Sequence, residues 1–276
     1  MSALWEGHES RVLVAAHRGE RFTAPENTMS AFRRAIAEGV DMIETDVRMT
    51  ADGELVLMHD ADVARTTDRT GPVREMSLMQ FRALNAAADY EDFAPEAPPT
   101  LEEFLKLCAE TDGMLIDLEL KEYPTTGNED FAYDCCDRTI AMLEDYGFGE
   151  RCVLNSFSGR LLEYIDEKYG HRYRLHGYYP YCMLKGARRD PREYLWCLCV
   201  ISAKQQSDGS MKHFNFNVPP KSYFDAVRAD GIEPWVCAGI YSREEIGRSA
   251  QLGASLITTD YPARTLEVLR ELGYHC

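Results

Sequence analysis

Residues 11 to 47 read RVLVAAHRGERFTAPENTMSAFRRAIAEGVDMIETDV and predict a strand, a helix and a second strand in that order. The apolar run Arg11 to Ala16 is typical of a buried strand. A helix is expected after Pro25 to Thr28, because apolar or small residues follow at three- and four-residue spacing until Gly39. These residues are Ala31, Phe32, Ala35 and Ile36. Val40 to Val47 predicts the next strand, so the stretch has the order of a parallel βαβ unit.

The same alternation continues toward the C-terminus. Further strands are expected at 114–120, 152–155, 172–177, 197–202, 233–238 and 255–258. Helical patterns lie near 100–110, 130–146, 158–168, 220–229, 242–251 and 262–271. Eight strands with interposed helices favour the α/β class and a (β/α)8 TIM barrel over an open sheet. The length of 276 residues fits one such barrel, so we predict a single domain over 1–276.

Two segments do not fit the repeat. The long connection 60–99 contains a helical stretch at 76–84 and a proline-rich end, and we interpret it as a small insertion over the mouth of the barrel. The segment 205–220 is polar and ends in two prolines. This composition is typical of an irregular connection, and a loop near the site and a plain surface excursion stay equally open.

The charge balance restricts the partners. The chain has 46 acidic and 30 basic residues, a formal net charge of −16. Such a surface repels nucleic-acid backbones and anionic lipid headgroups at long range, so neither is an expected partner. An anionic substrate would need a local positive centre, such as a bound cation or converging basic side chains.

The nine cysteines are scattered, and no two of them have the two-residue gap typical of zinc sites. Reduced, packed thiols in a cytosol fit this distribution better than a disulfide framework. Met1 to Glu9 has no long apolar core, so a secretory signal is not expected. No apolar run approaches the roughly 20 residues that span a bilayer. We therefore expect a cytoplasmic protein without stable membrane insertion.

Charged and titratable residues gather at the ends of predicted strands, where TIM barrels carry their chemistry. The clusters are His17-Arg18-Gly19, Glu44-Thr45-Asp46, His59-Asp60 and Glu119-Leu120-Lys121. Each cluster alone is a weak signal. Together they predict one active site.

The acidic residues predict a divalent metal ion. Glu44 and Asp46 stand two apart in a strand, so both side chains leave the same face. Two carboxylates facing a barrel interior repel each other, and Mg²⁺ or Ca²⁺ removes that penalty with the oxygen ligands it prefers. Glu119, at the end of another strand, can supply a third ligand. The alternative is a structural network in which these acids pair with Arg18 and Lys121.

The basic residues complete the prediction. His17 and His59 titrate near neutrality and lie at strand ends beside charged residues, an arrangement that suits a general base and a general acid. Arg18 and Lys121 can neutralise phosphoryl oxygens, the charge stabilisation on which phosphoryl transfer mostly relies. The alternative for these two residues is that of ordinary surface cations.

Residues 17 to 71 closely resemble the signature of the glycerophosphodiester phosphodiesterase family. The matching residues are His17-Arg18-Gly19, Ala24-Pro25-Glu26-Asn27-Thr28, Ala31-Phe32, Ala35, Gly39, Ile43-Glu44-Thr45-Asp46-Val47, Thr50, Asp52-Gly53, Leu55-Val56, His59-Asp60, Arg65-Thr66-Thr67 and Gly71. Further matches are Leu118-Glu119-Leu120-Lys121, Ser156-Phe157 and Thr258-Thr259-Asp260-Tyr261-Pro262.

The resemblance implies a TIM barrel with a small insertion after the second strand, and metal-dependent hydrolysis of glycerophosphodiesters to sn-glycerol 3-phosphate and an alcohol. It implies a metal held by Glu44, Asp46 and Glu119, general acid and base catalysis by His17 and His59, and phosphate binding by Arg18 and Lys121. These roles coincide with the roles argued from the chemistry of the side chains.

One departure concerns the leaving alcohol. The family usually carries Trp-Thr-Val-Asn at the seventh strand, where this chain reads Trp235-Val236-Cys237-Ala238. Trp235 remains and is expected to form an apolar wall for the substrate. The missing asparagine removes a polar group from the rim, so the sequence does not identify the alcohol.

Three other functions stay open. A phosphodiesterase of the same fold could act on lysophospholipids, although no long amphipathic helix suggests a membrane anchor. A barrel glycoside hydrolase could use Glu44 and Glu119 as acid and nucleophile, and such chemistry normally needs no divalent ion. A non-catalytic barrel that only binds a phosphoester would be expected to have lost at least one of the site residues, and all of them are present.

Overall fold

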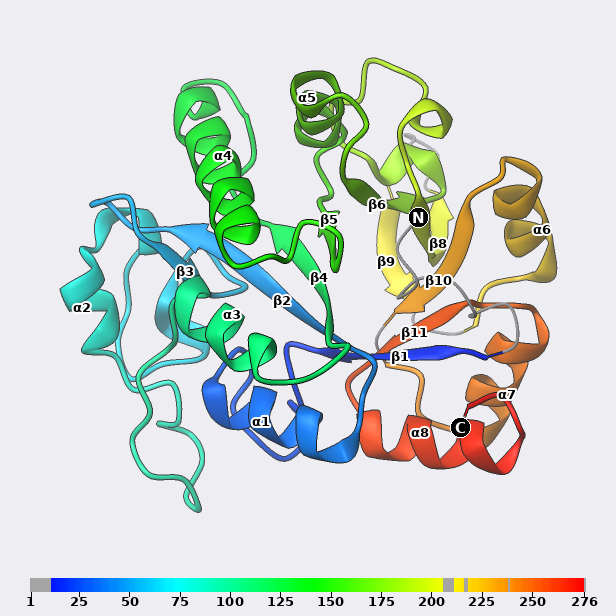
Figure 1. Cartoon of the computed structure of the whole chain (residues 1–276), viewed down its shortest axis with the longest axis horizontal. Coiled ribbons are helices and arrows are strands. Elements are labelled where there is room, and N and C mark those ends of the chain that lie inside the picture. Colours follow the sequence, from blue (N-terminus) through cyan, green and yellow to red (C-terminus); the bar gives the residue numbers. More distant parts are fainter. Residues whose placement is uncertain (1–10, 206–210, 216–217, 238, 276) are drawn as a thin grey trace. The chain divides into compact units, whose positions relative to one another are not determined.

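A computed structural model describes residues 11–205, 211–215, 218–237 and 239–275 (Figure 1). The chain forms two compact units, Met1–Ala15 with Val153–Cys276, and Ala16–Cys152. The predicted absence of a secretory signal at the N-terminus concerns residues outside those described. Among the described residues, no helix is long and apolar enough to cross a membrane.

Eight of the strands are those that the sequence predicts. They are β1 (Leu13–His17), β2 (Met42–Met49), β4 (Leu115–Leu120), β5 (Cys152–Asn155), β6 (Arg174–Tyr179), β7 (Cys197–Val200), β10 (Glu233–Cys237) and β11 (Leu256–Thr259). With β3 (Leu55–Leu57) they follow the hydrogen-bonded order β1-β11-β10-β7-β6-β5-β4-β2-β3, and β1 also pairs with β2. Eight parallel strands in this order, alternating with helices, form the closed barrel of the TIM fold, so the predicted fold class is confirmed.

The helices also correspond to the predicted ones. They are α1 (Met29–Glu38), α2 (Leu78–Arg82), α3 (Leu101–Ala109), α4 (Glu129–Asp145), α5 (Gly159–Tyr169), α6 (Lys221–Ala229), α7 (Arg243–Gln251) and α8 (Pro262–Glu271). In α1 the side chain of Thr28 caps the first turn by accepting from the Ala31 N–H. The helix ends at Gly39, whose φ of 82° is a left-handed conformation that glycine adopts without a steric penalty.

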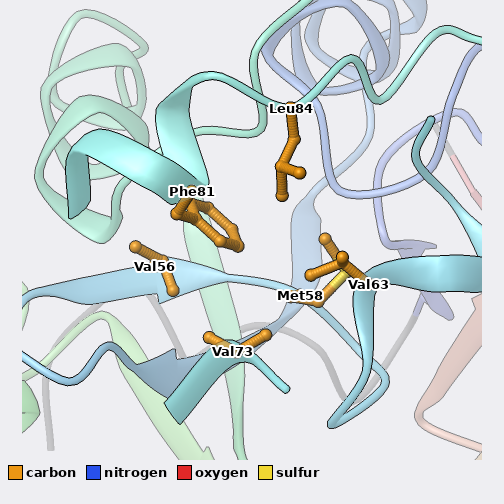
Figure 2. Packing of buried hydrophobic residues seen from close by; sticks show 6 residues of the cluster. All are labelled: Val56, Met58, Val63, Val73, Phe81 and Leu84. Atoms are coloured by element: carbon orange, nitrogen blue, oxygen red, sulfur yellow. The ribbon is translucent and has the colours of Figure 1, made fainter. Parts of the chain in front are cut away.

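The segment 60–99 contains the short helices η2 (Val63–Arg65) and η3 (Val73–Glu75) as well as α2. It shares a buried apolar cluster with β3 and the residue that follows β3. Figure 2 shows this cluster, which consists of Val56, Met58, Val63, Val73, Phe81 and Leu84. Strand β3 was not among the predicted strands, and it pairs antiparallel with β2 through Val47 and Leu57. Burial of these side chains fixes the segment on the β2–β3 ribbon of its own unit.

The irregular connection expected at 205–220 is in part a hairpin. Strands β8 (Ser202–Gln205) and β9 (Met211–Asn215) pair antiparallel, with an irregularity between Ala203 and Lys204. The prediction of irregular structure was therefore wrong for 211–215. A two-stranded ribbon satisfies its backbone hydrogen bonds between its own strands, so it can form from a polar sequence that lacks the apolar run of a barrel strand.

Candidate active site

The register of β2 and β4 brings the acidic residues together. In this parallel pair Asp46 lies opposite Glu119, and Glu44 lies opposite Asp117. Because side chains two apart on a strand leave the same face, all four carboxylates lie on one face of the β2–β4 pair. Each of the four residues is buried. Sequence reasoning missed Asp117, which looked like one more position of an apolar strand.

Three of these residues have the geometry of a cation site. Carboxylate oxygens of Glu44, Asp46 and Glu119 lie within 4.8 Å of one another. Burial, with the charge of Asp46 second, raises the pKa of Glu44 well above its ordinary value. Burial likewise raises the pKa of Glu119. The ionised forms of Glu44 and Glu119 are therefore disfavoured in the folded protein. A divalent cation would favour them, and hard oxygen donors in this arrangement suit Mg²⁺ or Ca²⁺.

Two basic side chains already pair with the acids. Lys121 Nζ lies 2.6 Å from Glu119 Oε1 and 3.1 Å from Asp46 Oδ1. Arg18 Nε lies 3.3 Å from Asp46 Oδ2. Burial alone would raise the pKa of Asp46, but Lys121 and Arg18 lower it below its ordinary value. Two cations face three carboxylates, so the structural network proposed as an alternative balances the cluster only while one of the acids is protonated, and the pKa of Glu44 is raised well above its ordinary value.

The loop after β1 is held in an unusual backbone conformation. Arg18 has a φ of +59° and Asn27 a φ of +53°, a region that costs a non-glycine residue about 1 kcal/mol or more. The Arg18 N–H donates to the backbone oxygen of Glu44 at 2.9 Å and to its Oε2 at 3.0 Å. The Asn27 N–H donates to the Arg18 carbonyl at 3.0 Å. These bonds fix the loop that carries His17 and Arg18 against β2.

Asn27 also contacts the candidate cation site. Its Nδ2 donates to Asp46 Oδ2 at 2.9 Å, while its Oδ1 accepts from the Thr45 hydroxyl at 2.8 Å. The residue is buried. Sequence reasoning gave Asn27 no role of its own, although its place between Glu26 and Thr28 in the matched signature was a signal.

Two different strands bring the two histidines near the acidic cluster. His17 ends β1, and its Nε2 lies 3.9 Å from Glu44 Oε2. His59 was expected at the end of the second strand, but it follows β3, which runs back antiparallel along β2. The Met58 N–H donates to the Asp46 carbonyl at 3.0 Å, which brings the neighbouring His59 to the site.

Burial lowers the pKa of His59 to about 4, against the opposing effect of Asp46. The ring is therefore neutral near pH 7. The Nδ1 of His59 lies 2.6 Å from Asp60 Oδ1. The backbone oxygen of His59 accepts two hydrogen bonds from the Arg48 side chain, of 2.8 and 3.2 Å. Arg48 in turn donates to Glu122 at 2.9 Å. Sequence reasoning missed Arg48 and Glu122, since a buried ion pair inside a strand pattern has no sequence signature.

Trp235 belongs to the other compact unit. It is only 2% exposed and makes edge-on contacts with His176 and Trp196, at ring-centroid distances of 4.8 and 5.9 Å. Its expected contact with the substrate stays a prediction.

Comparisons with known proteins point to one family of enzymes. The model of the glycerophosphoryl diester phosphodiesterase family matches residues 17–264. A glycerophosphodiester phosphodiesterase of Caldanaerobacter subterraneus subsp. tengcongensis is 30% identical over 275 residues, which cover 95% of this chain and 100% of that protein. A candidate glycerophosphoryl diester phosphodiesterase of Silicibacter pomeroyi has a similar crystal structure, with a TM-score of 0.78, 26% identity, and coverage of 98% of this chain and 96% of the other.

An Oleispira antarctica phosphodiesterase, solved with the product sn-glycerol-3-phosphate, shares the fold at a TM-score of 0.74 and 20% identity. That match covers 94% of this chain and 97% of the other. The family model extends over most of the chain, and the Caldanaerobacter relative matches it nearly from end to end. On this evidence the chain belongs to the glycerophosphoryl diester phosphodiesterase family.

Proposed function

We propose that this protein is a metal-dependent phosphodiesterase that hydrolyses glycerophosphodiesters to sn-glycerol 3-phosphate and an alcohol. The observation that carries the proposal is the group of three buried carboxylates, Glu44, Asp46 and Glu119, whose oxygens lie within 4.8 Å of one another. The relatives named above, and the product bound to the Oleispira enzyme, support the substrate class.

The three carboxylates would hold Mg²⁺ or Ca²⁺. A divalent ion in this position supplies Lewis-acid polarisation of a phosphoryl oxygen. Arg18 and Lys121 lie against the same carboxylates, so their charges are in place to neutralise other oxygens of the phosphate. These charges form the local positive centre that an anionic substrate needs on a chain of net charge −16.

The two histidines would move the protons. A neutral His59, held at Nδ1 by Asp60, is suited to accept a proton from the nucleophile. His17, beside Glu44, would then protonate the leaving alcohol. Whether the nucleophile is water or a hydroxyl of the glycerol is left to product analysis, because a cyclic phosphate forms only in the second case.

We further propose that residues 60–99 form an insertion over the mouth of a single TIM-barrel domain of residues 1–276. The supporting observation is that the segment begins with Asp60, which contacts His59, and shares its apolar core with β3. Trp235 is proposed as an apolar wall for the substrate. A cytoplasmic location is proposed because the described cysteines form no disulfide and several of them are buried.

The test is a coupled assay for released glycerol 3-phosphate with glycerophosphocholine, glycerophosphoethanolamine, glycerophosphoglycerol, glycerophosphoinositol and lysophosphatidylcholine. We expect activity on at least one glycerophosphodiester, its loss in EDTA, and its recovery when Mg²⁺ or Ca²⁺ is added. Full activity after removal of the metal would contradict the proposed mechanism and favour carboxylate chemistry of the glycosidase kind.

A further inference from the structure

Glu26 lies at the centre of a cluster of three guanidinium groups. Its Oε1 accepts from Arg18 Nη1 at 2.8 Å and from Arg65 Nη2 at 2.7 Å. Its Oε2 accepts from Arg21 Nη2 at 2.7 Å and from Arg65 Nη1 at 3.1 Å. One carboxylate thus receives four charge-assisted hydrogen bonds, which are stronger than bonds between neutral groups.

The position of Glu26 indicates more than a surface ion pair. Its side chain is only 9% exposed, so water screens these contacts weakly. Burial alone would raise the pKa of Glu26, but the three arginines lower it to about 2, and the residue stays ionised across the physiological range. The proposed reaction gives Glu26 no role.

One branch of the cluster leads to His59. The Arg65 Nε donates to Asp60 Oδ2, and Asp60 Oδ1 lies 2.6 Å from His59 Nδ1. Burial would raise the pKa of Asp60, but Arg65 and His59 lower it, so this carboxylate is ionised and can only accept. His59 must then donate from Nδ1, which places the lone pair of the neutral ring on Nε2.

A second branch of the cluster leads through Arg21 to His17, and it favours the tautomer opposite to that of His59. Arg21 Nη1 lies 3.4 Å from His17 Nδ1. A guanidinium can only donate, so His17 Nδ1 accepts and the proton of its neutral ring lies on Nε2. A third branch runs through Arg18 to Asp46 of the candidate cation site.

We infer that Glu26 is a positioning residue that holds His17 and His59 in opposite tautomers, through Arg21 on one side and through Arg65 and Asp60 on the other. The inference rests on the proposed function, because it gives these two tautomers to the histidines proposed as acid and base. A lone pair on Nε2 lets His59 accept a proton from the nucleophile, and a proton on Nε2 lets His17 donate to the oxygen of the leaving alcohol. As that proton is transferred, the negative charge left on the His17 ring would be met by the guanidinium of Arg21 at Nδ1.

The kinetic test compares Glu26→Gln with Glu103→Gln. Glu103 is a fair control, because it also binds an arginine with two hydrogen bonds, from Arg82 at 2.9 Å each, but lies outside this cluster. We expect Glu26→Gln to lower kcat by about 10- to 100-fold, with a much smaller change in KM and a shifted pH profile of kcat. A kcat within a factor of about 2 of that of Glu103→Gln would overturn the inference.

The spectroscopic test does not depend on turnover, so it separates this inference from the proposed function. Imidazole ¹⁵N chemical shifts report which ring nitrogen carries the proton. In the wild-type protein we expect the proton on Nδ1 of His59 and on Nε2 of His17. Arg65→Gln should disturb the tautomer of His59 only, and Arg21→Gln that of His17 only. Both side chains are partly exposed, at 46% and 25%, so these variants should fold even where Glu26→Gln does not.

Identical tautomers in the wild-type protein, or no change at the linked ring in either arginine variant, would refute the inference whether or not the enzyme hydrolyses a glycerophosphodiester. Absence of glycerol 3-phosphate release, together with the expected tautomers, would refute the proposed function alone.

Discussion

At the scale of single residues, Glu44 is an acid of the cation site whose ionised form is strongly disfavoured without a metal. It is buried beside Asp46, and its carboxylate accepts from the backbone N–H of Arg18 and lies 3.9 Å from His17 Nε2. A buried carboxylate without a compensating charge opposes folding, whereas a bound divalent ion that meets this charge stabilises the folded state. The stability of the folded protein should therefore depend on the metal, and a substitution of Glu44 should remove most of that dependence.

Glu44→Gln tests this idea. Without metal, we expect the variant to be at least as stable as the wild type, because a neutral amide replaces a buried acid whose ionisation is unfavourable. With Mg²⁺ or Ca²⁺ at about 100 times the dissociation constant, the wild type should gain about 2.7 kcal/mol and the variant far less. Thermal unfolding with EDTA and with each ion measures both effects. An equal gain in the two proteins would place the ion elsewhere.

The proton transfers are tested by His17→Ala and His59→Ala. Each change removes a group proposed to transfer a proton in the transition state, so turnover should fall by roughly 10² or more. The measurement is kcat with saturating metal, and circular dichroism shows whether each variant is folded. Near-normal turnover in one variant would remove that histidine from the mechanism.

The pH dependence of stability tests the environment of His59. Its pKa is about 4 in the folded protein against an ordinary 6.5, so the unfolded chain binds a proton in this window that the folded chain does not. The stabilisation is fully present above about pH 6.5 and is lost as the pH falls toward 4. Because the ring is partly exposed, we expect a loss of only about 1 kcal/mol between about pH 7 and 5.

Urea unfolding of the metal-free protein at the two pH values, compared with His59→Gln, isolates this effect from the acidic cluster. Glu44 and Glu119 have raised pKa values and act with the opposite sign, so the difference between the two proteins is the informative quantity. Parallel pH profiles would show that His59 titrates normally.

At the scale of elements, the site depends on how closely the loop after β1 approaches α1. Gly19 has a φ of +80°, and a Cβ built on it would lie 2.8 Å from the backbone carbon of Ala31. Gly19→Ala should therefore cost more than about 1 kcal/mol and displace the neighbouring Arg18, which lowers kcat. Gly113→Ala is the matched control, because Gly113 has a φ of +72° with open space around it.

Urea unfolding and kcat of the two variants measure the effect. If both lose the same stability, the backbone conformation alone explains the cost, and the close approach to Ala31 contributes nothing.

The elements that the sequence predicted well are those with a strong local pattern. Barrel strands buried on both faces give apolar runs such as Cys152–Asn155, whose bounds match the prediction. The three-residue β3 is too short to show a period, so the sequence did not reveal that His59 arrives on an antiparallel strand. Asp117 and Arg48 were missed for a related reason, since pairing across strands depends on register rather than on local sequence.

At the scale of the whole molecule, the net charge of −16 opposes the local positive centre that Arg18, Lys121 and a bound divalent ion would form together. The overall field acts over a distance that salt shortens to about 10 Å at 0.1 M, whereas the buried pairs are screened much less. Salt should therefore weaken the repulsion of a distant anion more than it weakens the binding of a docked one.

Two candidate substrates separate these effects. Glycerophosphoglycerol carries a net charge of about −1, and glycerophosphocholine is a zwitterion with a net charge near zero. On raising NaCl from about 20 to about 300 mM, we expect the ratio of their kcat/KM values, anion over zwitterion, to rise by a factor of about 2 to 5. Both substrates contain the same phosphodiester, so the ratio cancels salt effects on the metal and on the chemical step. A ratio that falls with salt would mean that the basic side chains of the site attract the anionic substrate at long range more strongly than the acidic surface repels it.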